Sequence, residues 1–348
     1  MHFFCSLIVF LCIIAFHESG HALTAKFFGV KINRIAIGFG KPIFLYVSKN
    51  NIEWVLCRWF FLGGYVELLD SRIHRQPILK HSFDQQSTLV QCIILMAGSI
   101  TNFLLAWLFY TIIFINGYHT QLPFIQNVIP ESIMAQAGLK SNDRLITINN
   151  QQVNSWTQAN MQLIRYLGKK DIIIQISNNN NINTLHVNLQ NIKFKNQKFF
   201  TVLGIQPQLN KTELIPKQSL YIAIQQSCHS VVQYIIFDLS LLKQIITGVL
   251  PLSQLLGPLG IFLFSAAALG QGILTFLAFL AVLNIAIGLT NLLPLPGLDG
   301  GLILYALIAK ISGKPISIAM EILLKQLAAI IFYLILVQLV IFDIQKLL

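Results

Sequence analysis

Charged residues are scarce in this chain of 348 amino acids. Asp, Glu, Lys and Arg together make up 11% of the residues, and only thirteen residues are acidic. A soluble domain typically carries about 25% charged residues. With 55% hydrophobic residues and a mean hydropathy of +0.67, the composition excludes an ordinary soluble domain and favours a membrane protein.

The shortage of acidic residues leaves a net charge of +11. The lysines and arginines are nevertheless scattered, with no basic stripe and no alternation with aromatic residues. Surfaces that bind nucleic acids usually show such a pattern. The sequence therefore predicts no nucleic-acid partner.

Cysteines are also few and dispersed. They lie at Cys5, Cys12, Cys57, Cys92 and Cys228, and none forms a C-x-x-C pair. This spacing argues against a zinc site built from thiolates. We interpret all five as small apolar side chains.

Long apolar runs dominate the rest of the chain. Four are near the length needed to cross a bilayer, at about 2 to 28, 89 to 116, 273 to 293 and 327 to 343. The run from Leu259 to Leu269 is too short for a fifth span. We therefore expect about four transmembrane helices.

The first span contains the sequence His17-Glu18-Ser19-Gly20-His21. On a helix, H-E-x-x-H places two imidazoles on one face, where both can hold one Zn²⁺ while the glutamate activates water. A charge at membrane depth costs roughly 2.5 to 3.5 kcal/mol on insertion scales, and a metal would offset that cost. A cleaved signal peptide is disfavoured because no basic segment precedes the run. A polar cluster that only joins helices remains an alternative.

A catalytic zinc site needs a third protein ligand. Asp299 is the best candidate, because two prolines break the third span just before it and irregular backbone at membrane depth usually lines a functional cavity. A helix restarting at about Gly300 would place Asp299 near its N-terminus. An ordinary N-cap role is the alternative. Asp343 is expected to be interfacial.

Basic residues orient the chain. They cluster after the first span, from Lys26 to Lys80, and before the last span, from Lys310 to Lys325. By the positive-inside rule both connections lie in the cytoplasm. The long region from about 118 to 258 and both termini then lie outside.

The segment from Val30 to Val66 alternates apolar and polar residues between glycines such as Gly38 and Gly40. This pattern predicts short strands joined by tight turns. The part after Trp54 is too apolar for an exposed loop. It is either a hairpin that dips into the membrane and lines a protein cavity, or an ordinary interfacial hairpin.

These motifs together resemble the site-2 protease family of intramembrane zinc metalloproteases. The resemblance extends over nearly the whole chain and is closest to bacterial regulators that cut anti-sigma factors and cleaved signal peptides. It is carried by His17-Glu18-Ser19-Gly20-His21, by Gly63-Gly64-Tyr65-Val66 and by Asn291-x-x-Pro294-x-Pro296-x-Leu298-Asp299-Gly300. Met96-Ala97-Gly98-Ser99-Ile100-Thr101-Asn102 matches the motif of the second span, except that Ser99 stands where the family usually has proline.

The resemblance implies a role for each motif residue. It assigns His17, His21 and Asp299 to one Zn²⁺ per chain and Glu18 to catalysis. It also implies that Asn291 and Pro294 position the substrate. The segment 30–66 is likened to the family's membrane-embedded β-hairpin region.

The outside region resembles a PDZ domain of the bacterial protease type. The similar residues run from Ala135 to Asn149, and strand-like segments follow at 172–176 and 185–189. Asn142 and Asn150 replace the usual glycines, and asparagine is the next-best residue for left-handed turn positions. The region fits one such domain, whereas better-known enterobacterial relatives carry two.

We therefore predict a polytopic α-helical membrane protein with a membrane-associated β-hairpin region and one extracytoplasmic PDZ-like α+β domain. Its parts are a first membrane segment (1–117), the PDZ-like domain (118–208), amphipathic linker helices (209–258) and a second membrane segment (259–348).

The predicted function is cleavage of peptide bonds within the transmembrane segments of membrane proteins, such as anti-sigma factors or signal-peptide remnants. The expected location is the bacterial inner membrane, with transmembrane substrates and the lipid bilayer as partners. An inactive scaffold that binds peptides through its PDZ-like domain is one alternative, although it would need no Glu18. A zinc transporter is another, although it would usually need polar residues throughout the bilayer.

Overall fold

The computed structural model describes residues 2–74, 81–178, 181–190, 192, 194 and 199–347, with the side chains of 2–9, 39, 59–62 and 73–74 left aside. The chain forms two compact units. The helical unit contains Met1–Tyr110 and Pro258–Ile341, and the α+β unit contains Thr111–Gly257 and Phe342–Leu348. Two long helices, α3 and α11, contribute residues to both units.

The helical unit is built on six helices of the described chain. They are α1 (His2–Phe27), α3 (Thr88–Asn116), α8 (Pro258–Gly270), α9 (Ile273–Asn291), α10 (Asp299–Ser312) and α11 (Ile318–Leu347). The segments Thr88–Asn116, Leu252–Gly270, Ile273–Asn291 and Ile318–Leu347 are long and apolar enough to cross a membrane. Helix α1 covers the first predicted span.

The run 259–269 belongs to a longer apolar segment, Leu252–Gly270, in which the short 3-10 helix η2 (Leu252–Gln254) precedes α8. Because α8 itself has 13 residues, a fifth span stays outside the prediction. The last span is also longer than predicted, since α11 covers 30 residues.

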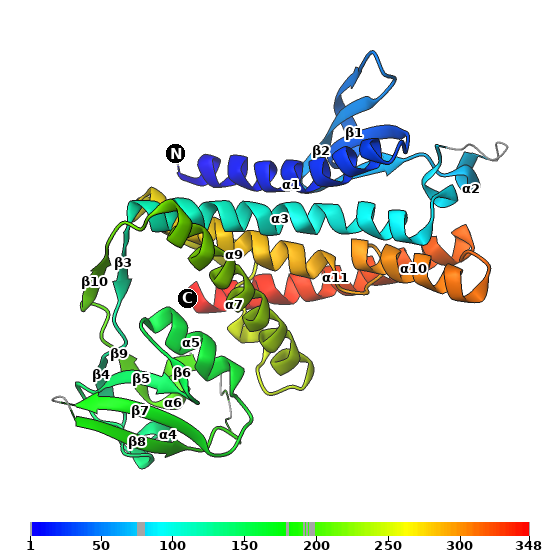
Figure 1. Ribbon diagram of the computed structural model, residues 1–348. Helices are drawn as coiled ribbons and strands as arrows, with labels where there is room; N and C mark the ends of the chain where they lie inside the picture. Colours follow the sequence, from blue (N-terminus) through cyan, green and yellow to red (C-terminus); the bar gives the residue numbers. More distant parts are fainter. Residues whose placement is uncertain are drawn as a thin grey trace. The chain divides into compact units, whose positions relative to one another are not determined.

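Small residues let the helices of this unit approach closely. Helices α1 and α3 run side by side (Figure 1), and a side chain at Gly20 would collide with the Ala97 carbonyl and the Thr101 hydroxyl of α3. A side chain at Gly288 of α9 would also be crowded, since its Cβ would lie 2.9 Å from the Phe103 ring and 3.2 Å from the Ser99 carbonyl oxygen of α3. Such contacts are typical of membrane helices, where packing replaces the hydrophobic effect. Ser99 itself leaves α3 continuous.

The predicted hairpin is present, but its strands are long and bent. Strands β1 (Ile32–Val47) and β2 (Glu53–Leu68) have 16 residues each. Residues 34–37 of β1 pair with 64–67 of β2 and also with 53–56. Gly38 and Gly40, with φ of 90° and 92°, lie where β1 bends, so the strand turns without ending.

The bend leaves one edge of this sheet open. Residues 42–47 pair only with 53–57 among the described residues. The side chains from Ile43 to Val47 are 49% to 62% exposed. An open, apolar sheet edge can accept a further strand.

The connection between the hairpin and α3 is held by polar contacts. It includes α2 (Ser71–His74) and the short η1 (Phe83–Gln85). Asp84 accepts hydrogen bonds from the Ser71 amide (2.9 Å) and hydroxyl (2.5 Å). Burial favours a raised pKa for Asp84, but these hydrogen bonds hold its pKa below the usual value. Arg72 pairs with Asp70 at 2.6 Å and lies 3.5 Å from Glu321 of α11.

The α+β unit is a small domain followed by a long helix. Its elements are β3 (Tyr118–Gln121), β4 (Ile125–Val128), α4 (Ile133–Gln136), β5 (Arg144–Ile148), β6 (Gln151–Gln152), α5 (Trp156–Arg165), β7 (Ile172–Asn178), β8 (Asn181–Val187), α6 (Phe199–Leu203), β9 (Ile205–Pro207), β10 (Thr212–Ile215) and α7 (Leu220–Ile246). The main sheet has the order β6-β5-β7-β8, and β4–β9 and β3–β10 form two further pairs.

The apolar positions of these elements form one core. Ile148, Leu163, Ile174 and Leu203 are among its fully buried members. The two strand-like segments predicted at 172–176 and 185–189 correspond to β7 and, in part, to β8. Asn142 and Asn150 have φ of 69° and 64°, which confirms the left-handed turns expected there.

The range 209–258 differs from the predicted linker helices. It contains β10, one helix α7 and the short η2. The end of α7 and the turn after it pack on the small domain. Leu250, four residues beyond the helix, clusters with Ile164 and Leu167, and the Gln244 side chain of α7 donates a hydrogen bond to the Leu167 carbonyl (3.1 Å). This segment is therefore part of the unit and not a free linker.

Candidate metal centre and active site

The motif residues His17, Glu18 and His21 lie on α1 and are buried. Their exposed fractions are 7%, 8% and 7%. The two histidines are four residues apart, so a regular helix places them on one face. The predicted arrangement of the motif on a helix is therefore present.

Asp299 reaches these histidines from a distant part of the sequence. Its Oδ2 atom lies 3.2 Å from Nε2 of His17 and 3.2 Å from Nε2 of His21. The two Nε2 atoms are themselves 3.2 Å apart. The three atoms thus form a nearly equilateral triangle.

This triangle fits a zinc ion. Ligand atoms at 2.0–2.1 Å from a tetrahedral zinc lie about 3.3 Å from each other, close to the separations of these three atoms. Oδ2 of Asp299 is buried and receives no hydrogen bond from the described residues, so a cation would satisfy it. Three protein ligands leave the fourth position free for water, as in catalytic zinc sites.

Contacts from α3 orient both imidazoles. Nδ1 of His21 lies 2.8 Å from the Ile94 carbonyl, and Nδ1 of His17 lies 3.2 Å from the side-chain amide of Asn102. A histidine that binds metal through Nε2 keeps its proton on Nδ1, so the Ile94 carbonyl is a suitable acceptor for the proton of His21. The atom of Asn102 that lies beside Nδ1 of His17 is the amide nitrogen Nδ2. These contacts turn Nε2 of each ring toward Asp299.

Gly98 makes room for the two rings. A Cβ atom at this position would collide with Nε2 of His21 and would lie 2.7 Å from Nε2 of His17. Gly98 lies one turn after Ile94 and one turn before Asn102 on α3. This helix therefore contributes a carbonyl, a gap and an amide at successive turns.

The start of α10 positions Asp299. Helix α9 ends at Asn291 and α10 begins at Asp299, so the expected break and restart of the third span are present. Side chains at Gly300 and Gly301 would collide with the Leu292 and Leu295 carbonyls. Two glycines after the aspartate therefore allow the connecting loop to fold against the first turn of α10.

Glu18 lies beside the hairpin. A Cβ atom at Gly64 of β2 would be 3.1 Å from Cγ of Glu18 and 3.0 Å from the Ala36 carbonyl. The glycine thus lets β2 pass close to the glutamate. Glu18 is next to the presumed ligands in sequence and is not part of the triangle, as its predicted catalytic role requires.

Comparisons with known proteins agree with this geometry. The sequence model of Peptidase family M50 matches residues 5–336. The "Regulator of sigma E protease" of Haemophilus influenzae is 26% identical over 404 aligned residues, covering 89% of this chain and 91% of that protein. A "Putative zinc metalloprotease" of Rickettsia conorii is 28% identical over 371, covering 98% of each chain. The "Regulator of sigma-E protease RseP" of Escherichia coli is 24% identical over 408, covering 88% and 90%.

The chain belongs to peptidase family M50. Membership confirms the resemblance to the site-2 proteases, together with the predicted enzyme class and intramembrane protease function. Use of zinc agrees with the names of the relatives and with the His17, His21 and Asp299 triangle.

In this M50 peptidase, Asn291 and Pro294 lie in the stretch that leads to Asp299. Asn291 is the last residue of α9 and is half-buried, whereas Pro294 is exposed in the following loop. Their role in positioning the substrate stays a prediction.

Three residues of α3 that contact the site were not predicted as site residues. Asn102 had a signal, because a fully buried amide in an apolar span needs a partner. Gly98 had a weaker signal, since glycine is common wherever membrane helices pack closely. The contact of Ile94 uses its backbone carbonyl, which any residue could supply, so no sequence signal existed.

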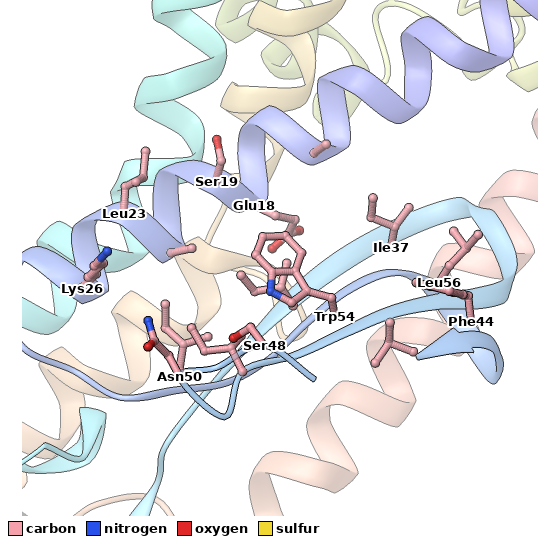
Figure 2. A pocket seen from close by; sticks show the side chains of 16 residues that line it. Glu18, Ser19, Leu23, Lys26, Ile37, Phe44, Ser48, Asn50, Trp54 and Leu56 are labelled. Carbon is pink, nitrogen blue, oxygen red and sulfur yellow. The ribbon is translucent and has the colours of Figure 1, made fainter. Parts of the chain in front are cut away.

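A cavity of about 600 Å³ adjoins Glu18 between α1 and the hairpin. Figure 2 shows its walls, with Glu18, Leu23 and Lys26 on α1 and Ile37, Phe44, Trp54 and Leu56 on the strands. Most of the lining side chains are apolar. Glu18 therefore faces a space suited to an apolar peptide.

Proposed function

We propose that His17, His21 and Asp299 hold one Zn²⁺ and that Glu18 is the general base of a protease that cleaves transmembrane segments. The triangle of three ligand atoms with 3.2 Å sides supports this proposal best. Zinc, when bound, lowers the pKa of a coordinated water and polarises the scissile carbonyl. Glu18 takes the proton of the attacking water and later donates it to the leaving amine.

The substrate must unwind before its peptide bond can react. A transmembrane helix hydrogen-bonds and shields its own carbonyl groups, and free backbone groups are costly in lipid. The open edge at residues 42–47 offers backbone partners to an extended segment, and its side chains are apolar. Asn291 and Pro294 would position the same segment from the loop before Asp299.

The names of the relatives indicate the class of substrate. Two are regulators of a sigma factor, which fits substrates such as membrane-bound anti-sigma factors. Signal-peptide remnants have the same chemistry, an apolar helix in the membrane. The bacterial inner membrane is the corresponding location, with basic connections in the cytoplasm.

The small α+β domain would act as a single extracytoplasmic PDZ-like domain. The left-handed turns at Asn142 and Asn150 and the positions of β7 and β8 support this assignment. By the positive-inside rule the connection after the first span is cytoplasmic, so the zinc site near the end of that span would lie toward the cytoplasmic half of the membrane. A domain outside the membrane could then take no part in bond cleavage. Its role would be to select substrates by excluding bulky outside domains or by holding new C-termini.

The two alternative functions are less well supported. A scaffold that only binds peptides would not need a buried glutamate beside three ligand atoms. A transporter needs polar groups along a path, whereas one cluster of metal-ligating side chains is found among the described residues.

The decisive experiment is Glu18→Gln in the full chain in membranes, with the exposed Glu131→Gln as matched control. We expect cleavage of a transmembrane substrate to fall to background in Glu18→Gln while zinc per chain stays near wild type. The control should keep both. Full activity of Glu18→Gln would refute the assignment of the active site, and complete loss of zinc would refute the role of Glu18 as a base.

A further inference from the structure

The cavity beside Glu18 extends along α1. Glu18, Ala22 and Lys26 all line it and follow at intervals of four residues, so they share one face of the helix. Figure 2 shows Lys26 and Asn50 toward one end, with Ile37 and Leu56 toward the other. We name the part between Glu18 and Lys26 the Lys26 arm.

The length of the Lys26 arm corresponds to a short peptide. Eight residues of α-helix separate Glu18 from Lys26, which is about 12 Å along the axis. An extended chain advances about 3.3 Å per residue. The arm therefore accommodates three to four extended residues.

The walls of the arm are apolar in the middle and polar at the far end. Ala22 on α1 and Trp54 on β2 contribute apolar surface, and Ser48 and Asn50 are polar lining residues from the tip of the hairpin. Ala22 has the smallest side chain of the three aligned positions. A larger residue there would narrow the arm directly beside the glutamate.

We propose that the Lys26 arm binds the three to four substrate residues on one side of the cleaved bond, and that Ala22 and Trp54 determine which side chains fit. The proposal rests on the proposed function, because Glu18 must act at the reacting bond. When the scissile peptide bond lies beside Glu18, the residues that follow on one side of the bond enter the Lys26 arm, because the arm starts at Glu18. The apolar walls match the side chains of a transmembrane segment, and the polar end matches the point where it leaves the lipid.

Side-chain selection in the arm is expected to alternate. Neighbouring side chains of an extended chain point to opposite faces, so only one or two of the first three positions should meet Ala22 or Trp54. Charged residues at these positions should block cleavage, because burying an unpaired charge is costly. From the fourth position on, an aspartate should be tolerated beside Lys26, Ser48 and Asn50.

The test uses the zinc-loaded full chain in lipid vesicles and one transmembrane peptide whose cleavage site is mapped by mass spectrometry. Ala, Leu, Phe, Trp or Asp is placed at each of the first four positions on either side of the bond. The enzymes are wild type, Ala22→Leu, Trp54→Ala and the control Ala267→Leu. Ala267 is an exposed alanine of α8 that does not line the cavity.

Ala22→Leu should lower kcat/KM for Phe and Trp relative to Ala by about tenfold or more, at one or two positions on the cytoplasmic side of the bond only. Trp54→Ala should raise kcat/KM for the Phe and Trp peptides relative to the Ala peptide. Ala267→Leu should change neither. Cleavage of the alanine peptide and normal zinc content serve as the folding check, and Trp54→Ala decides the question if Ala22→Leu does not fold.

Three results would overturn the proposal. The first is that the ratio of kcat/KM for the Phe and Trp peptides to that for the Ala peptide stays unchanged in both variants. The second is that this ratio changes only for substitutions on the other side of the cleaved bond. The third is that cleavage of all peptides slows equally, as expected if a lipid chain fills the arm. A wild-type enzyme that cuts no peptide would instead refute the proposed function. The two failures are therefore distinguishable.

Discussion

Asp299 and Asp343 occupy different regions of the molecule and have different surroundings. Asp299 begins α10 in the helical unit, and its buried Oδ2 atom receives no hydrogen bond from the part of the chain that the structure describes, while two imidazole nitrogens lie 3.2 Å away. Asp343 lies near the end of α11 in the α+β unit, is 2% exposed and accepts a hydrogen bond from the Gly257 amide at 2.9 Å.

The difference separates a candidate metal ligand, Asp299, from a structural residue, Asp343. A buried carboxylate oxygen without a donor costs free energy unless a cation satisfies it. A buried carboxylate that accepts backbone N–H bonds is already satisfied and holds its donor in place. The expectation that Asp343 is interfacial stays a prediction; within the protein, the loop before α8 contacts its carboxylate. Four predictions test this contrast.

The largest effect is expected for Asp299→Ala. Two histidines alone leave the zinc ion with too few ligands, so both zinc content and cleavage should fall sharply. Asp343→Ala should retain both, which makes it the matched control. Metal analysis of the purified proteins and peptide cleavage in vesicles measure the two quantities. If the two variants behave the other way round, the ligand has been misassigned.

Gly98→Ala should have the second largest effect. The added methyl group collides with the imidazole of His21, and a shift of about 1 Å in a catalytic group can lower the rate about a hundredfold. Gly270→Ala is the control, because a Cβ there meets no atom within 4 Å. The measurement is the rate of peptide cleavage in vesicles. Equal cleavage rates for the two variants would show that the imidazole rings of His17 and His21 tolerate displacement.

Asp343→Ala should act on stability instead. Removal of the carboxylate leaves the buried Gly257 amide without its acceptor, which costs about 1 to 3 kcal/mol. Thermal unfolding in detergent should show a lower midpoint than for Asp171→Ala, whose carboxylate pairs with His186 at the surface. Unfolding midpoints that coincide for the two variants would mean that the Gly257 contact contributes nothing.

Removal of the small domain should leave the zinc site intact. Strands β3 and β10 pair at the base of the small domain. At the end of this pair the Leu122 amide donates a hydrogen bond to the Lys211 carbonyl (2.9 Å). Replacing residues 123–210 by a short Gly/Ser bridge should preserve cleavage of a pre-trimmed transmembrane peptide and permit some cleavage of an untrimmed one.

The readout for this deletion is the ratio of the two cleavage rates at matched expression. An unchanged ratio would reject the selective role of the domain. Loss of all activity in a zinc-loaded variant would show that this domain supports the active site directly.

Much of the candidate zinc site could be predicted because its residues carry strong local signals. His17, Glu18 and His21 form a spaced motif, and the prolines before Asp299 mark a break in an apolar span. Asn102 and Gly98 were missed as site residues because a buried amide or a glycine in a membrane helix has several common explanations. The bends in β1 and β2 were missed because alternation reports on strands but not on where they fold back.

The sequence by itself determined the candidate zinc-ligand types, the approximate apolar spans and the position of the turn asparagines, because these depend on residue chemistry and local spacing. The tertiary structure alone decided which carboxylate completes the triangle and which accepts the Gly257 amide. It also decided that the Ile94 carbonyl orients His21 and that a cavity adjoins Glu18. These features arise where segments distant in the sequence pack together. No local sequence pattern encodes which backbone groups will form contacts or which side chains will line a cavity.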